Sequence, residues 1–318
     1  FWFWGQVLCL ALSLTLLARR ASGGFDPLVI ASVLTLGLST GIATDELRLG
    51  QFTAMLLLIL TVASLLLSRG LEKSAGFLVG LMIALKVFAW PIALVFALRR
   101  RFRAAIVAFV TAAALNLACL SFLSLPELVD YYTRIGPLNA GYWRGAEGNL
   151  SAWTVSGRLF SGFGFGLHVD PLWPNPRLAS LTLAIAPAFL LAALLAANAR
   201  ARNPETAFGF SVMASVLLSP ICWPFYFLLA LVPAAILGER LARGGLPPRQ
   251  TTAALLCLAL FATRFDSYRH LVTPPGEFAR LSFLQGLILL APAVGVAGLG
   301  ALLWMTDGPA SPENSRHV

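Results

Sequence analysis

A lysine inside an apolar stretch is the residue of this sequence that most strongly indicates chemistry. Lys86 interrupts the hydrophobic run 74–98, and Pro91 follows it closely. A lysine at membrane depth has to be neutralised, reach water along its own stem, or bind an anion. A phosphate at the membrane interface would satisfy Lys86, because lysine acts on phosphate as a point charge. A structural ion pair with a carboxylate is the alternative.

Two further polar segments carry candidate groups. The sequence TDELRLGQ at 44–51 places two carboxylates and a guanidinium between apolar stretches, which is also typical of a solvated loop. Gln51 opens the next apolar run, where its amide could cap backbone groups or bind a hydroxylated ligand. The long polar segment 126–176 is rich in tyrosine, tryptophan and arginine. Such residues suit sugar faces and phosphates, although part of this aromatic content could be an interfacial belt.

Metal and disulfide chemistry have weak support. The four cysteines have no CxxC spacing and lie in or beside apolar stretches, so packing as small hydrophobic residues is favoured. His168 and His270 have no second ligand at metal spacing. We therefore expect no metal ligands and no resident cofactor, while a divalent metal is not excluded.

The elements that must position these residues follow from the composition. Of the 318 residues 58% are hydrophobic and only 12% are charged, and the mean hydropathy is +0.81. The apolar residues form blocks about as long as a helix needs to cross a membrane. A soluble enzyme, a disordered chain and a disulfide-rich secreted domain are excluded. The net charge of +9 is dispersed between the blocks, as orientation signals are, and does not indicate a nucleic-acid partner.

The predicted fold is an all-α polytopic membrane protein of about eleven helical segments, two pairs of which are helical hairpins. The single-helix segments are 4–18, 27–43, 51–68, 104–125, 177–198, 251–263 and 281–303. The hairpins are 74–98, which turns at Lys86–Pro91, and 206–238, which turns at Ser219–Tyr226.

The charges support the first hairpin. It places 14 of the 23 basic residues on one face, whereas a single span over 74–98 splits them evenly and buries Lys86. The positive-inside rule therefore favours the hairpin. The long connections then gather on the opposite, outer face, where functional sites usually lie. We expect one transmembrane domain, 1–303, with an outer loop 126–176 and a polar cytoplasmic tail, 304–318.

Four motifs in order resemble a known family. They are Gly50-Gln51-Phe52-Thr53, then Gly76-Phe77-Leu78-Val79-Gly80-Leu81 leading to Lys86, then Gly148-Asn149-Leu150-Ser151, and Leu218-Ser219-Pro220 leading to Trp223 and Tyr226. Over about residues 1–240 their order and spacing resemble glycosyltransferase family 87, membrane enzymes of the GT-C superfamily. That family includes polyprenyl-phosphate-mannose-dependent mannosyltransferases. Many relatives place Asp-His after the tryptophan of the last motif, whereas Pro224-Phe225 stand here.

The resemblance implies transfer of a hexose, with mannose expected, from a polyprenyl-phosphate sugar to a lipid or glycan acceptor. It implies a multi-pass protein of the bacterial inner membrane, among membrane lipids, with its active face extracytoplasmic. The family's catalytic Asp is expected upstream of Phe1, with Asp45 and Glu46 as second choices. Lys86, Arg48 and Arg144 are the expected donor-phosphate ligands. The candidates for acceptor or sugar binding are Gln51, Glu147, Asn149, Trp223 and Tyr226.

The rival function is a transporter or lipid flippase with an anion site at the middle of the membrane. Broken helices with a lysine are also found in transporter sites. The sequence shows no inverted repeats, and its long connections are one-sided, which favours the transferase.

Overall fold

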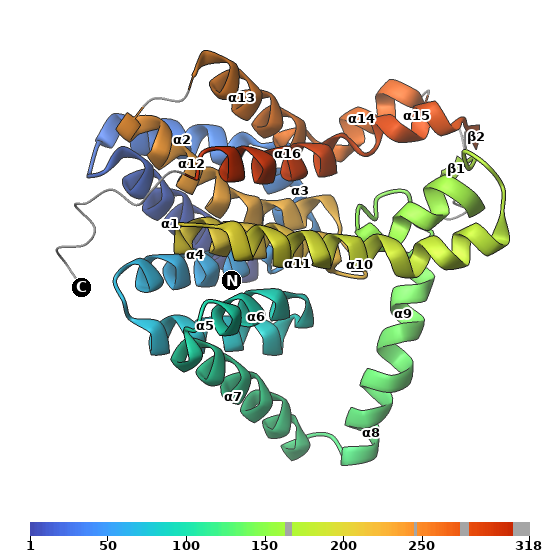
Figure 1. Cartoon of the computed structure of the whole chain (residues 1–318), viewed down its shortest axis with the longest axis horizontal. Helices are drawn as coiled ribbons and strands as arrows, with labels where there is room; N and C mark the ends of the chain where they lie inside the picture. The colour runs from blue at the N-terminus through green and yellow to red at the C-terminus, as the bar shows by residue number, and fades with distance from the viewer. Residues whose placement is uncertain (163–166, 245–246, 274–279, 308–318) are drawn as a thin grey trace.

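The computed structural model describes residues 1–162, 167–244, 247–273 and 280–307. Within these ranges the chain forms sixteen α-helices (Figure 1). Their only strands, β1 (His168–Val169) and β2 (Arg280–Leu281), pair in parallel. Four helical stretches are long and apolar enough to cross a membrane, or five if one bent pair counts as a span. They are Trp2–Ser22, Phe102–Ser121, Pro176–Arg200 and Pro224–Ala242. The expected all-α polytopic membrane fold is confirmed.

The helices outnumber the eleven expected segments because two expected spans are broken and three further helices form where connections were expected. The segment predicted as 27–43 is a pair, α2 (Pro27–Ser39) and α3 (Gly41–Leu49), bent by 61°. Thr40 starts α3 by accepting a hydrogen bond from the Ala43 N–H, and Gly50 ends it with a φ of 63°. The polar sequence expected as a solvated loop at 44–51 is therefore mostly helical.

The expected outer loop 126–176 is also folded in part. It contains α8 (Leu125–Asp130), a π-helical turn over Tyr131–Ile135, and α9 (Gly136–Trp143). The last expected span, 281–303, divides into α15 (Phe283–Ile288) and α16 (Ala291–Met305) just before Pro292. Proline has no N–H to continue the helical hydrogen bonds, which accounts for the break there. The expected tail lies outside the described residues after Asp307.

Both predicted hairpins are confirmed. In the first, α5 (Glu72–Leu85) and α6 (Trp90–Leu98) are joined by Lys86 and a 3₁₀ turn over Val87–Ala89. Its two ends meet where Arg101 pairs with Glu72 at 3.3 Å. The second consists of α11 (Pro204–Leu218), a 3₁₀ helix over Pro224–Ala230, and α12 (Leu231–Gly244). Its ends are tied by a hydrogen bond from Arg240 to the Thr206 hydroxyl.

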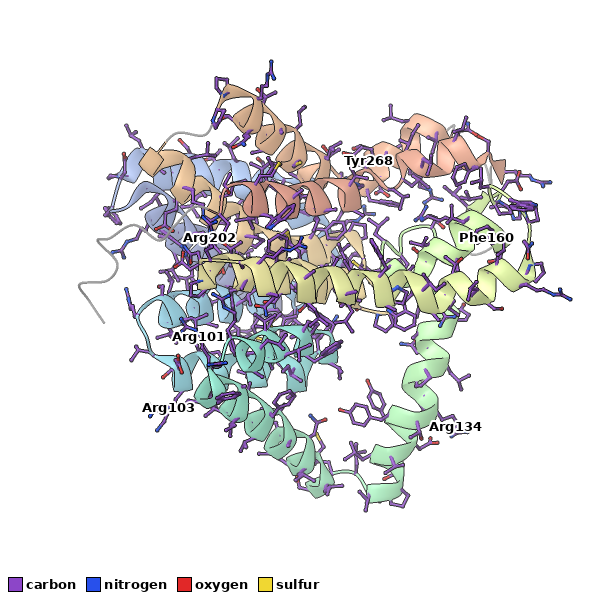
Figure 2. All side chains as sticks on the ribbon, viewed as in Figure 1. Arg101, Arg103, Arg134, Phe160, Arg202 and Tyr268 are labelled. Carbon is purple, nitrogen blue, oxygen red and sulfur yellow. The ribbon has the colours of Figure 1, made fainter. Side chains whose placement is uncertain are left out.

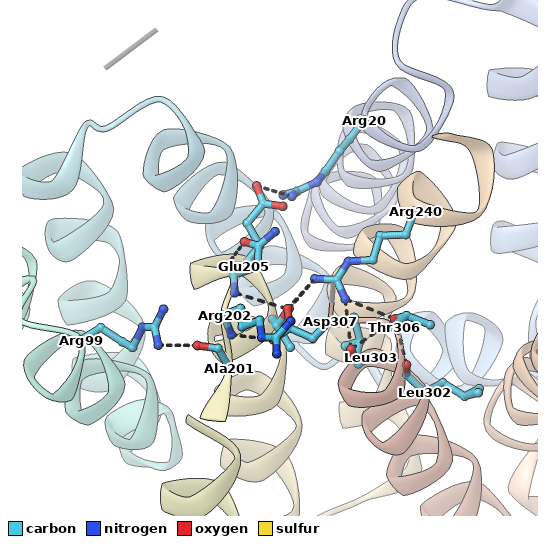
Figure 3. A network of polar contacts seen from close by, with 12 residues as sticks. Arg20, Arg99, Ala201, Arg202, Glu205, Arg240, Leu302, Leu303, Thr306 and Asp307 are labelled. Atoms are coloured by element: carbon cyan, nitrogen blue, oxygen red, sulfur yellow. Dashed lines mark hydrogen bonds and ion pairs between the residues drawn. The ribbon is translucent and has the colours of Figure 1, made fainter. Parts of the chain in front are cut away.

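A polar network joins the helices at one end of the bundle, which we call the arginine-rich end (Figure 3). Arg20, from α1 (Trp2–Ser22), pairs with Glu205 at 2.7 Å and with Glu239 at 2.9 Å. Asp307, just after α16, accepts hydrogen bonds from the backbone N–H of Arg202 at 2.6 Å and from Thr206. The network fixes α1, α11, α12 and α16 to one another.

The remaining helices complete the bundle around a continuous apolar core. They are α4 (Thr53–Ser68), α7 (Phe102–Ala118), α10 (Pro176–Arg200), α13 (Pro248–Ala262) and α14 (Phe265–Val272). The helix α8 lies at the far end of α7, away from the bundle, and α9 leads from there back to the bundle (Figure 1). The connection between α13 and α15 contains α14, and its residues 274–279 lie outside the described ranges.

The first hairpin packs on α7 through small residues. At Gly76 and Gly80 of α5, an added Cβ would collide with the backbone carbonyl oxygens of Ala104 and Ala108. Small residues four apart are a common contact between membrane helices, because they let the backbones approach closely. This contact fixes the position of α5 and therefore of Lys86 at its end.

We expect Gly76→Ala to lower the free energy of unfolding by about 1–3 kcal/mol, the usual cost of overpacking. Gly5→Ala is the matched control, since it also adds one methyl to a membrane helix but has no atom within 4 Å of the new Cβ. Thermal unfolding of both variants in detergent measures the difference. Equal midpoints for the two variants would contradict the close contact between α5 and α7.

Candidate active site

A cleft of about 390 Å³ opens at the end of the bundle opposite the arginine-rich end. In Figure 2 this end carries Phe160 and Tyr268, while Arg101 and Arg202 mark the other. Four segments far apart in the sequence form the cleft. Its lining is Asp45, Arg48, Leu49, Ala146, Glu147, Gly148, Trp223, Pro224, Phe225, Phe265, Asp266 and Arg269. Aromatic rings beside carboxylates and guanidinium groups can bind the apolar face and the hydroxyl groups of a sugar.

The Asp45 wall of the cleft is an ion-pair cluster. The Asp45 carboxylate accepts a hydrogen bond at 2.8 Å from Arg264, whose guanidinium also lies 3.4 Å from Asp266. The hydrogen bond to Asp45 raises the pKa of Arg264, so this arginine is a permanent cation. Arg48, one turn along α3, is exposed and also lines the cleft. A carboxylate and an exposed guanidinium group therefore lie at the same wall.

The opposite wall is built around Glu147. One carboxylate oxygen accepts the Leu167 N–H at 2.9 Å, and the other lies 3.9 Å from Arg269. Arg158 lies behind this wall, only 4% exposed, and donates to the backbone carbonyl of Glu147 at 3.1 Å. Burial lowers the pKa of Arg158 to about 10, and the Glu147 carboxylate opposes that shift. Arg158 is therefore still cationic at neutral pH and interacts electrostatically with the Glu147 carboxylate.

Asn149 holds the loop to the turn of the second hairpin. Its side chain is fully buried, and its oxygen accepts the N–H of Cys222 at 2.9 Å and of Ser151 at 3.2 Å. Its amide nitrogen donates to the carbonyls of Trp143 and Pro220. Both the oxygen and the nitrogen of the Asn149 side chain are hydrogen-bonded to the backbone. Asn149 therefore holds the loop in position and does not line the cleft.

Trp223 and Tyr226 are both candidates for acceptor or sugar binding, and of the two only Trp223 lines the cleft. The Trp223 ring lines the cleft and meets the Trp143 ring edge-on at 5.4 Å. Tyr226 is 6% exposed and stacks on Phe88 at 5.6 Å. Trp223 has extended backbone angles before the 3₁₀ helix, whereas Tyr226 lies within it, so the two side chains diverge.

Lys86 lies behind the same turn. Its ammonium donates a hydrogen bond to the Tyr226 hydroxyl and lies 4.8 Å from the centre of the Phe52 ring. Leu85 and Val87 on either side of it are exposed at the hairpin tip. Lys86 itself is half-buried, and the turn 223–226 contacts it through Tyr226 and lines the cleft through Trp223.

Other predicted site residues have separate positions. Glu46 is fully buried, and neither it nor the half-buried Gln51 and Arg144 are part of the cleft lining among the described residues. Gln51 lies between α3 and α4, and Arg144 follows α9. In the described part of the chain, no three histidine, cysteine, aspartate or glutamate side chains are grouped to hold a metal.

The sequence interpretation did not identify the residues that α14 contributes. Phe265, Asp266 and Arg269 all line the cleft. The sequence FDSYRHLV is amphipathic, with Phe265, Tyr268 and Val272 buried on one side, and this spacing could have indicated a short helix. Nothing local to it indicates pairing with residues near position 45.

Comparisons with known proteins agree with the four motifs. The family model described as Glycosyltransferase family 87 matches residues 1–224. No curated protein and no solved structure matches the chain. The match covers all four motifs except Tyr226, and most of the chain. This protein therefore belongs to glycosyltransferase family 87 and is a membrane glycosyltransferase.

Proposed function

We propose that the protein transfers a hexose, with mannose the expected sugar, from a polyprenyl-phosphate donor to a lipid or glycan acceptor. The family supplies the reaction class. The donor assignment is supported by a cation at a hairpin tip that has exposed apolar neighbours. The acceptor assignment is supported by a cleft lined with aromatic and charged groups.

The reaction needs two kinds of group. A carboxylate takes the proton of the acceptor hydroxyl group while the oxygen of that hydroxyl group bonds to the anomeric carbon of the sugar. The bond from that carbon to the phosphate oxygen breaks, and its electron pair leaves with the polyprenyl phosphate. Cations stabilise the negative charge that develops on the leaving phosphate. Among the described residues, the carboxylates that line the cleft are Asp45, Glu147 and Asp266.

The placement of Lys86 carries this proposal. Its ammonium lies at the tip of the first hairpin, beside exposed apolar side chains that can contact the donor's hydrocarbon chain. The turn that contacts Lys86 through Tyr226 also presents Trp223 to the cleft. A donor with its phosphate at Lys86 can therefore extend its sugar past this turn toward an acceptor in the cleft. Arg48, exposed on the cleft side, is the second proposed phosphate ligand.

We also propose that the cleft end faces the extracytoplasmic side of a bacterial inner membrane. The arginine-rich end gathers basic residues from several helix ends, including Arg20, Arg99, Arg101, Arg202 and Arg240. Such clusters favour the cytoplasmic side of the membrane.

Incorporation of radiolabelled sugar tests the proposal. The natural full-length protein in liposomes with bacterial membrane lipid extract should transfer label from polyprenyl-phosphate mannose to a new lipid or glycan product. Labelled GDP-mannose, which has the same sugar but no lipid, is the control and should give no product. Movement of label across the bilayer without a new glycosidic bond would contradict a transferase and support the transporter.

A further inference from the structure

Lys86 also lies within electrostatic range of a carboxyl group, at a longer distance than an ion pair. Glu46, from α3, interacts electrostatically with the Lys86 ammonium, although the two residues come from separate helices. Around the same ammonium, the centre of the Tyr226 ring lies at 4.1 Å and that of Phe52 at 4.8 Å. Aromatic faces attract a cation, but they do not replace an anion in a site with little water.

Glu46 is a buried carboxyl group that can accept more hydrogen bonds than it does. Its side chain is fully buried, and one carboxylate oxygen accepts the Ala54 N–H at 3.1 Å. In the described part of the chain the other oxygen is buried without a hydrogen-bond partner. A buried carboxylate oxygen without a donor is costly unless a cation is near, and Lys86 is the cation that interacts with Glu46.

The backbone around Glu46 fixes this placement. The Glu46 carbonyl accepts the N–H of Gly50 and of Gln51, so the end of α3 closes tightly on this residue. Its neighbour Asp45 lines the cleft, whereas Glu46 does not. An acceptor hydroxyl in the cleft therefore meets Asp45 and not Glu46.

We propose that Glu46 is the counter-ion of Lys86 and holds its ammonium in place for the donor phosphate. It is thus a positioning residue and not the base suggested by the sequence. The proposal rests on the proposed role of Lys86 in phosphate binding. An ammonium has three N–H donors. Tyr226 accepts one, and Glu46 acts on the ammonium through its charge at longer range, so two N–H groups remain for phosphate oxygens.

Glu46→Gln separates this role from a merely structural one. The variant keeps an oxygen for the Ala54 N–H and removes the charge. In the full-length protein we expect the KM for polyprenyl-phosphate mannose to rise about tenfold or more, the effect of one charge-assisted hydrogen bond. We expect kcat to change much less. Glu239→Gln removes a carboxylate at the arginine-rich end and should leave this KM unchanged.

Coupling between the two residues is measured without turnover. Thermal unfolding of Glu46→Gln, Lys86→Met and the double variant should be non-additive, because each single change leaves the other charge unpaired. Added polyprenyl phosphate should raise the unfolding midpoint of wild type more than that of Glu46→Gln. Additive effects on stability, or a large fall in kcat at unchanged KM, would overturn the positioning role.

A further outcome identifies which assumption has failed. If the two residues couple in stability but polyprenyl phosphate stabilises Lys86→Met as much as wild type, the ion pair exists and Lys86 does not bind the donor. That result rejects the proposed function of Lys86 and, with it, the positioning role of Glu46.

Discussion

Lys86→Met is expected to reduce sugar transfer by about 100-fold or more, the scale of losing one electrostatic stabiliser of the leaving group. Methionine keeps most of the apolar stem and removes the cation. Contacts with Phe52 and Phe88 around the hairpin tip should survive, so the fold should persist. Transfer from polyprenyl-phosphate mannose, measured per folded molecule of the full-length protein, checks this expectation.

Two further variants show whether a loss of activity in Lys86→Met comes from the loss of this particular charge. Lys73→Met changes the only other lysine of the sequence, at the arginine-rich end, and should leave transfer unchanged. Lys86→Arg should retain part of the activity, because the charge stays while its geometry changes. A Lys86→Met protein that is destabilised by its unpaired Glu46 but transfers sugar normally per folded molecule would reject the phosphate role.

The hairpin that holds Lys86 could be predicted because its signals are local. A lysine in an apolar run, a proline after it and the balance of arginines all favour a turn there. The pairing of Arg101 with Glu72 confirms that turn. The four motifs likewise identified the family, because they preserve order and spacing along one chain.

Other features depend on contacts that a single sequence does not contain. Asp45 pairs with Arg264, 219 residues away. Neighbouring residues on a helix point about 100° apart, so Asp45 and Glu46 face different surroundings once α3 is helical. If residues 44–51 form a loop, nothing in the sequence distinguishes the two carboxylates as candidate bases. The helix assigns Asp45 to the cleft and Glu46 to the interior beside Lys86.

The position of Tyr226 in the second hairpin could not be predicted from the sequence either. The prolines predicted a turn at the cleft end, but the sequence does not show where the 3₁₀ helix starts. That start lies between Trp223 and Tyr226, so one aromatic residue faces the cleft and the other faces Lys86. A shared motif therefore contributes to both halves of the proposed site.

Trp223→Ala is expected to lower kcat/KM for sugar transfer by about 30-fold or more. A tryptophan in a pocket commonly contributes 2 kcal/mol or more to binding, which corresponds to a factor of that size. Its ring lines the cleft beside Gly148 and Phe225 and packs edge-on against Trp143. In the variant, a sugar entering the cleft would no longer contact this aromatic surface, while the charged residues of the cleft walls would remain.

Matched changes separate loss of the ring from loss of fold. Trp173→Ala removes a tryptophan that is 62% exposed and outside the cleft lining, so transfer should stay near wild type. Gly148→Ala keeps the Trp223 ring but places a Cβ 3.2 Å from its Cζ3 atom, so the ring must move. We expect this variant to have intermediate activity, because the ring is displaced and not removed. Equal activity of Trp223→Ala and Trp173→Ala, at matched thermal stability, would show that the cleft does not bind the sugar.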